Sequence, residues 1–131
     1  MRLLLDTHVA LWAITDSALL PSFARDLIAD PANEVMISAA SIWEIAIKHA
    51  LARRGPNAMP ISATEALGYF SDSGYGLLSI MPQHARMVEE LPPLHADPFD
   101  RMLVAQALSE PLRLLTHDTQ VAAYSDTVIR V

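Results

Sequence analysis

The chain contains no cysteine, which excludes disulfide bonds and thiolate metal ligands and is typical of a reducing compartment. Long apolar runs are missing too, since no stretch of the sequence approaches the roughly 20 residues that a membrane-spanning helix needs. The first residues do not resemble a secretory signal, because an acid already stands at position 6. We therefore expect a cytoplasmic protein without a membrane segment.

Basic side chains are scarce: fifteen acids outnumber nine Lys and Arg residues, for a formal charge of −6, and Lys48 is the only lysine. Proteins that hold nucleic acids by charge alone draw most of their affinity from Lys and Arg on the phosphates. Any phosphate contact must therefore come from a local group of cations. The candidates are Lys48, Arg53, Arg54 and Arg101. A solvated helix end explains Arg53 and Arg54 equally well.

Strands alternate with helices along the whole chain. With 131 residues, 52% of them apolar, the sequence is sufficient for a single globular domain spanning residues 1–131. Short apolar runs predict strands over 2–5, 35–38, 77–80, 113–116 and 127–131. Helical patterns, several of them bounded by proline, are predicted over 8–14, 21–29, 41–53, 63–71, 82–91 and 98–109. This alternation predicts an α/β fold with a mostly parallel sheet between two helical layers.

Four carboxylates each stand where an apolar run gives way to a helical pattern: Asp6, Glu44, Asp100 and Asp118. Parallel strands bring their carboxyl ends to the same edge of a sheet, where α/β proteins place their sites. Acids gathered there would repel one another unless a divalent cation held them together. The pattern therefore favours metal-dependent phosphodiester chemistry.

Helix capping offers a second interpretation of the same acids. Asp6 and Asp118 stand where N-caps are expected, and for either residue alone a cap is the favoured interpretation. Asp97 is followed by proline and then by an acid at position 100, as in a typical helix start. Ser41 and Glu44 have the spacing of a capping box. Capping does not explain why these acids follow predicted strands, and the two roles are compatible.

Four segments carry a resemblance that covers nearly the whole chain. They are residues 4–8 (LLDTH), 38–48 (SAASIWEIAIK), 91–101 (LPPLHADPFDR) and 115–118 (LTHD). Together, and in this order, they resemble the PIN-domain nucleases, and more narrowly the VapC-type toxins of bacterial type II toxin–antitoxin pairs. The resemblance implies a three-layer α/β/α PIN-like domain with a central sheet of four to five strands. It also implies a Mg²⁺- or Mn²⁺-dependent endoribonuclease that forms a homodimer and is neutralised by a cognate VapB-like antitoxin.

The resemblance implies that the family's site acids correspond to Asp6, Glu44, Asp100 and Asp118. Asp97 is close enough in sequence to Asp100 to contribute to the same site. We expect Asp6 and Asp100 to be direct metal ligands, and Glu44 and Asp118 to be ligands or to orient water.

Several neighbours of these acids are candidates for supporting roles. The hydroxyls of Thr7 and Thr116 would orient a carboxylate or water, or would make only local turn bonds. The histidines beside the motifs (His8, His95 and His117) have no repeated ligand spacing, so we expect them outside the ligand set. Trp12 and Trp43 would meet a partner or a base, although burial in the core is the favoured expectation for Trp43.

Two other functions fit parts of the pattern. A receiver-type signalling domain also has an acidic Mg²⁺ pocket, but it needs paired acids after the first strand and a lysine late in the chain. Here Asp6 stands alone and the lysine is at position 48. The stronger rival is a non-catalytic α/β binding module whose carboxylates only cap helices.

Overall fold

The structure, a computed structural model, describes residues 1–51 and 59–131. In these residues five strands form one sheet in the order β3-β2-β1-β4-β5, and every pairing is parallel. The strands are β1 (Arg2–Leu5), β2 (Glu34–Ser38), β3 (Gly76–Leu78), β4 (Arg113–Thr116) and β5 (Ile129–Arg130). The predicted α/β class is therefore confirmed, and the sheet is more uniformly parallel than expected.

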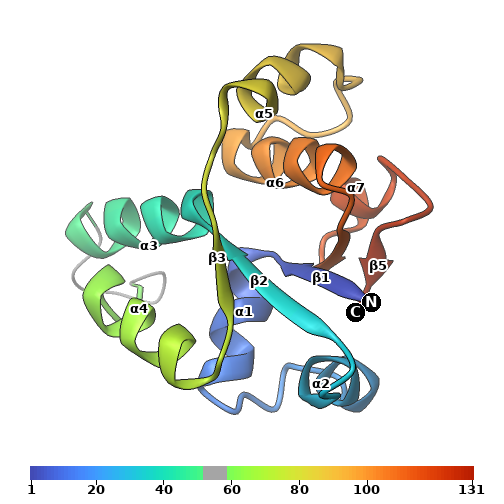
Figure 1. Ribbon diagram of the computed structural model, residues 1–131. Coiled ribbons are helices and arrows are strands. Elements are labelled where there is room, and N and C mark those ends of the chain that lie inside the picture. The colour runs from blue at the N-terminus through green and yellow to red at the C-terminus, as the bar shows by residue number, and fades with distance from the viewer. Residues whose placement is uncertain (52–58) are drawn as a thin grey trace.

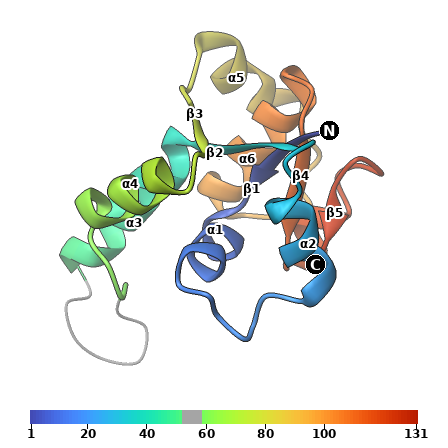
Figure 2. The ribbon, with the colours of Figure 1, turned by 60° about the horizontal axis from the view of Figure 1, so that its bottom comes forward.

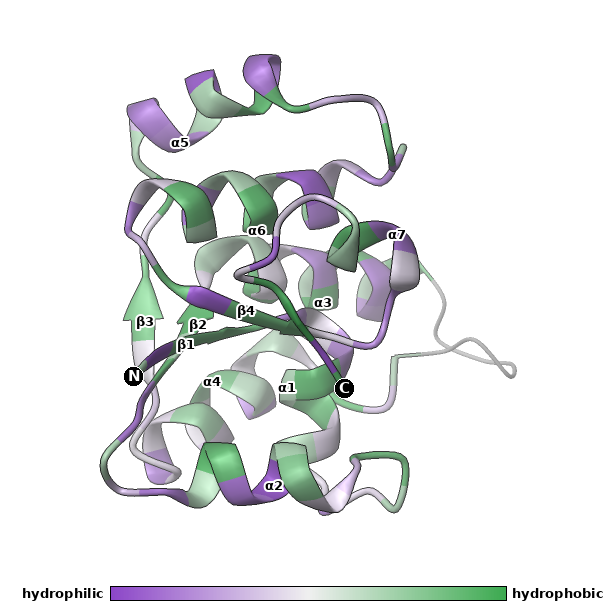
Figure 3. Cartoon of the chain, turned by 90° about the vertical axis from the view of Figure 1, so that its right-hand side faces the viewer, coloured by the Kyte–Doolittle hydropathy of each residue, from purple (hydrophilic) through white to green (hydrophobic). Residues whose placement is uncertain are grey.

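Helices cover both faces of the sheet, giving three layers (Figure 1; Figure 3). One layer holds α1 (Thr7–Ile14), α2 (Ser22–Ala29) and α4 (Ala63–Asp72). The other holds α5 (Pro82–Met87), α6 (Pro98–Ser109) and α7 (Thr119–Ala122). Figure 2 shows α3 (Ala39–Leu51) lying beside α4, and α3 also contacts α1 and α6. This helix therefore joins the two layers.

Alternate residues of β1 serve two separate hydrophobic cores. Leu3 and Leu5 pack with residues of α1, α2 and α4, whereas Leu4 packs with α6 on the opposite face. All three side chains are fully buried. Because successive side chains of a strand point to opposite faces, a run of leucines is what a strand covered on both sides requires.

The strand order places a topological switch between β1 and β4. From β1 the chain adds β2 and then β3 on one side, and it adds β4 and β5 on the other. The backbone N–H of Asp6 donates to the carbonyl of Leu115, so the carboxyl ends of these two strands are joined directly. Sites of open α/β sheets lie at such points, because the connecting chains diverge there and leave a crevice.

Some local expectations need correction. α3 begins at Ala39, so Glu44 lies in its second turn and the predicted capping box of Ser41 and Glu44 is wrong. Ser38 makes the cap bond instead, its Oγ accepting from the N–H of Ala40 at 3.0 Å. The helix expected to reach residue 91 ends as a 3₁₀ turn, Val88–Glu90. The sequence pattern predicted a cap at Asp118 but no helix after it, and the structure has the short helix α7 there. The expected end of the helix at Arg53 lies outside the described residues.

Ser62 caps α4 in a reciprocal capping box with Glu65. Among the residues that the structure describes, no helix combines the length and the apolar character needed to cross a membrane.

Two glycines provide a matched test of this backbone. Gly74 adopts φ +78°, a conformation that L side chains rarely adopt, whereas Gly68 lies within α4 with open space at its Cβ position. We expect Gly74→Ala to lower the free energy of unfolding by about 1 kcal/mol. Gly68→Ala should raise it by roughly 0.5–1 kcal/mol, because alanine restricts the unfolded chain. Urea denaturation measures both, and equal effects of the two changes would contradict the assigned turn.

Candidate active site

Asp6 lies at the end of β1 and caps α1. Its Oδ1 accepts from the N–H of Val9 at 2.8 Å, and its Oδ2 accepts from the hydroxyl of Thr116 at 2.6 Å. The side chain is buried, with both oxygens held by donors from separate parts of the chain. This carboxylate is therefore fixed in position before any ligand arrives.

Asp118, two residues beyond β4, caps the short helix α7. Its Oδ1 accepts from the amides of Gln120 and Val121, at 2.7 and 3.2 Å. Its own N–H donates to Thr116 Oγ1 at 3.1 Å, so a single hydroxyl links Asp118 to Asp6. Thr116 thus does what its sequence position indicated, because it orients one carboxylate and binds the backbone of another.

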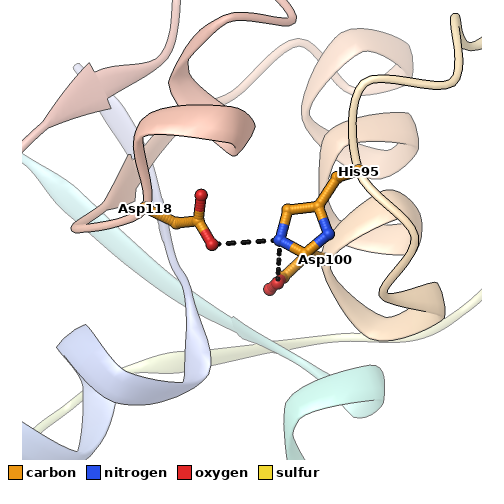
Figure 4. Close-up of side chains that lie close together, drawn as sticks. All are labelled: His95, Asp100 and Asp118. Atoms are coloured by element: carbon orange, nitrogen blue, oxygen red, sulfur yellow. Dashed lines mark hydrogen bonds and ion pairs between the residues drawn. The ribbon is translucent and has the colours of Figure 1, made fainter.

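Asp97 caps α6, and Asp100 lies in the first turn of that helix. Asp97 Oδ1 accepts from the amides of Phe99 and Asp100, at 2.8 and 3.1 Å. Asp100 caps nothing and turns toward His95 and Asp118 (Figure 4). One ligand atom from each of His95, Asp100 and Asp118 lies within 4.8 Å of the other two. These three side chains form the tightest cluster of possible metal ligands in the described residues.

The hydrogen bonds of His95 define its role in this cluster. The N–H of Asp97 donates to His95 Nδ1 at 3.0 Å, so this nitrogen accepts and the proton of the neutral ring lies on Nε2. Nε2 is 3.0 Å from Asp118 Oδ2 and 3.3 Å from Asp100 Oδ2. His95 Nε2 therefore donates to Asp118 Oδ2 and lies close to Asp100 Oδ2.

The side chains at the ends of β1, β4 and the loop before α6 enclose a cavity of about 430 Å³. Its lining comprises four carboxylates and four aromatic or imidazole rings: Asp6, Asp97, Asp100, Asp118, His8, Trp12, His95 and His117. Three of the four predicted acids therefore meet in one place, together with Asp97. Of these rings, only Trp12 was considered from the sequence for contact with a base or a partner, and none was predicted as part of the site.

Glu44 lies beside the cavity and does not line it. It is buried on α3, with Oε1 accepting from the hydroxyl of Thr7 at 2.6 Å and Oε2 paired with Lys48 Nζ at 2.5 Å. Thr7 follows Asp6 directly, so the Glu44 carboxylate is held one residue away from the cavity wall. Its negative charge nevertheless acts on both Asp6 and Asp100.

Crowding of the acids shifts their pKa values. Burial raises the pKa of Asp6, although the bonds from Thr116 and Val9 oppose this. Burial, followed by the charges of Asp97, Asp6 and Glu44, raises the pKa of Asp100 to about 7, while His95 opposes the rise. Asp118 differs: burial also disfavours its ionised form, but bonds from His95 and the helix amides hold its pKa below the ordinary value.

These donors fit a divalent cation. The carboxylate oxygens around the cavity are hard ligands, and the ionised form of Asp100 has no helix amide to stabilise it. A cation next to Asp100 would lower the cost of ionising it. Asp100 and Asp6 offer the oxygens that would hold such an ion, with Asp118 placed to bind it directly or through water.

Two of the predicted phosphate-binding cations, Arg101 and Lys48, have other partners. Arg101 donates to the carbonyls of Pro92, Val88 and Leu91 and to the hydroxyl of Tyr124, so its guanidinium fixes the loop before α6. Lys48 is paired with Glu44. Arg53 and Arg54 lie outside the described residues.

The expected burial of Trp43 is wrong. Its side chain is 59% exposed, because it projects from α3 and packs edge-on against Phe99 with ring centroids 5.1 Å apart. Trp12, by contrast, is half-buried at the wall of the acidic cavity.

The sequence profile of the PIN domain matches residues 3–126, nearly the whole chain. The chain belongs to the PIN domain family. No curated protein is significantly similar to this PIN domain in sequence.

Solved structures share its fold. VapBC2 from Rickettsia felis, bound to a DNA fragment from its promoter, has a TM-score of 0.67 at 14% identity, over 100% of this chain and 98% of the other. DNA-bound VapBC from Salmonella typhimurium has a TM-score of 0.63 at 14% identity, covering 100% and 97%. VapBC-5 from Mycobacterium tuberculosis has a TM-score of 0.60 at 21% identity, covering 99% and 98%.

The raised pKa of Asp100 predicts a stabilising substitution. A folded-state pKa of about 7, against an ordinary value of 3.8, means that the folded protein binds an extra proton between these values. The free energy of unfolding therefore falls as pH rises from about 4 to about 7. Asn at position 100 stays neutral, so Asp100→Asn should stabilise the metal-free protein at pH 8 by on the order of 2 kcal/mol.

Thermal unfolding in EDTA at pH 8 and at about pH 4 measures this effect. Most of the gain should be lost at the lower pH, where Asp100 is protonated in the folded state and about half protonated in the unfolded state. Asp72→Asn, at an exposed position at the end of α4, is the matched control and should not change the pH dependence. A lower unfolding temperature for Asp100→Asn at pH 8 would contradict the assigned electrostatics.

Proposed function

We propose that this PIN domain is a Mg²⁺- or Mn²⁺-dependent endoribonuclease, the VapC-type toxin of a type II toxin–antitoxin pair. The observation that carries the proposal is the convergence of Asp6, Asp100 and Asp118 on one cavity at the switch between β1 and β4. These residues come from three distant segments, and helix capping alone does not require them to meet. The PIN family membership and the shared fold of VapBC proteins support the same conclusion.

Each residue has a defined task in this proposal. Asp6 and Asp100 would hold the cation, and a bound cation would polarise the phosphate and make water a better nucleophile. Asp118 orients the attacking water. His95 holds the carboxylate of Asp118 on the side that faces Asp100. Thr116 fixes Asp6, and Thr7 fixes Glu44, whose charge adds to the attraction for a cation. Attack by water on the phosphorus breaks the bond to O3′, leaving a 5′-phosphate and a 3′-hydroxyl.

A VapB-like antitoxin and a second copy of the chain are the proposed protein partners. Trp43 lies between two mostly apolar cavities of about 390 and 360 Å³, formed by α3 with α4 and β3 on one side and with α5 and α6 on the other. Leu67 and Leu77 add exposed apolar surface beside it. An exposed tryptophan in such surroundings is typical of a protein interface.

The rival function, a non-catalytic binding module, is favoured by one observation. Asp6, Asp97 and Asp118 all accept amide hydrogen bonds as helix caps. Asp100, however, caps nothing, and burial together with the neighbouring charges raises its pKa to about 7. A module that needed only caps would have no use for it. The rival predicts no effect of Mg²⁺ on the unfolding temperature.

Asp6→Asn tests the catalytic role. The amide is nearly isosteric and can still accept from Val9, so the fold should survive. We expect RNA cleavage to fall by at least about a hundredfold, because a neutral amide binds a divalent cation poorly. A gel assay of RNA cleavage with Mg²⁺ or Mn²⁺ measures the loss, and Asp72→Asn should keep full activity.

EDTA should silence the wild-type protein in the same assay, and added Mg²⁺ or Mn²⁺ should restore cleavage. Product ends carrying a 5′-phosphate support hydrolysis by water, whereas a cyclic phosphate would mean attack by the RNA 2′-hydroxyl. Full metal-dependent activity in Asp6→Asn would remove this residue from the mechanism.

Expression in bacteria tests the toxin role. The wild-type chain should arrest growth and generate new RNA ends, and co-expression of the product of the adjacent gene should relieve both effects. Asp6→Asn, expressed to the same level, should arrest growth neither alone nor with that product. Mapping RNA ends across the transcriptome identifies the substrate. Unchanged growth without new RNA ends would favour the binding module.

A further inference from the structure

One wall of the acidic cavity is aromatic, and no step proposed above uses it. Trp12 on α1 lies between two histidines that line the same cavity, with ring centroids 6.3 Å from His8 and 5.4 Å from His117. The His117 ring meets the indole edge-on, at an interplanar angle of 71°. His8 and His117 are both exposed, and Trp12 is half-buried. Flat, partly accessible rings therefore lie beside the carboxylates.

Contacts with the rest of the fold fix the orientation of two of these rings, His117 and Trp12. His117 Nδ1 is 2.6 Å from the carbonyl oxygen of Val131, which can only accept, so Nδ1 donates and the orientation of the ring is set. Trp12 also packs against the hydrophobic core beneath α1. A ring fixed in this way loses little conformational freedom when a second ring stacks on it.

The aromatic wall would supply affinity for nucleic acid that the charges of the described residues do not. The chain has a formal charge of −6, Lys48 is paired with Glu44, and Arg101 is engaged with backbone carbonyls. Within residues 1–51 and 59–131, the usual source of affinity for nucleic acid, cations on phosphates, is therefore weak around this cavity. Stacking of bases on aromatic rings supplies affinity without charge, and it tolerates any base.

We propose that Trp12, flanked by His8 and His117, stacks on an unpaired base next to the phosphate held at the carboxylates. This inference rests on the proposed nuclease function and adds to it the side chains that contact the base beside the cleaved bond. A paired base presents its edges to solvent and keeps its faces stacked in the duplex, so it cannot lie on the wall.

Fluorescence of Trp12 tests the contact directly. The sequence contains two tryptophans, so Trp43→Phe leaves Trp12 as the only indole. In this variant, with Asp118→Asn added to prevent cleavage while the proposed cation ligands Asp6 and Asp100 are kept, a labelled single-stranded oligoadenylate is titrated in Mg²⁺. Binding is followed by anisotropy of the label. We expect quenching of Trp12 emission that follows binding, and neither quenching nor comparable binding with a duplex of the same length. The mirror variant, Trp12→Phe with Trp43 retained, should show no quenching.

Affinity provides the second readout. Trp12→Ala should weaken single-strand binding by about tenfold, and Trp12→Phe should restore most of it, because a phenyl ring still stacks. Circular dichroism and thermal unfolding show whether each variant is folded, and the Phe variant keeps the test valid if the Ala variant is not.

The possible failures are separable. Binding of the oligonucleotide without quenching of Trp12, or duplex binding as tight as single-strand binding, overturns the stacking inference. Absence of any oligonucleotide binding overturns it as well. Neither result decides the nuclease function, which depends on metal-dependent cleavage by the wild-type chain.

Discussion

Mutual repulsion of carboxylates at the end of β1 and β4 is the constraint around which this structure is arranged. Helix amides and Thr116 stabilise the charges of Asp6, Asp97 and Asp118, although burial still raises the pKa of Asp6. Asp100 lacks such support, and its pKa rises accordingly. The fold thus concentrates negative charge at one point and compensates most of it, leaving an uncompensated part that a cation can satisfy.

The same helix starts serve both stability and the site. An N-cap carboxylate must lie at the end of its helix, and in a parallel sheet the helix starts follow the carboxyl ends of the strands. Capping therefore places acids at the sheet edge where a site forms. The two interpretations of the sequence, caps or ligands, were not alternatives for Asp6 and Asp118, because each carboxylate has two oxygens and more than two lone pairs.

The sequence predicted the strands and the meeting of Asp6, Asp100 and Asp118, because a short apolar run followed by an acid is a local signal. Strand order was not predictable, since the order depends on which hydrophobic faces pack together over long distances. The capping box at Glu44 failed because Ser38, at the end of β2, caps α3 first. Trp43 was assigned to the core from its apolar character, although the side of α3 on which it projects faces solvent. The part played by His95 depends on the direction of one hydrogen bond from Asp97, which no sequence pattern reveals.

The absence of any cap bond at Asp100 has an evolutionary consequence. Drift at positions 6, 97 or 118 threatens the integrity of a helix start, so selection for a folded chain protects these acids even where activity is worthless. Position 100 enjoys no such protection, since a neutral residue there relieves repulsion. In a lineage where the activity is no longer selected, position 100 should therefore be the first of these acids to be replaced. The resulting domain should be folded, more stable and inactive.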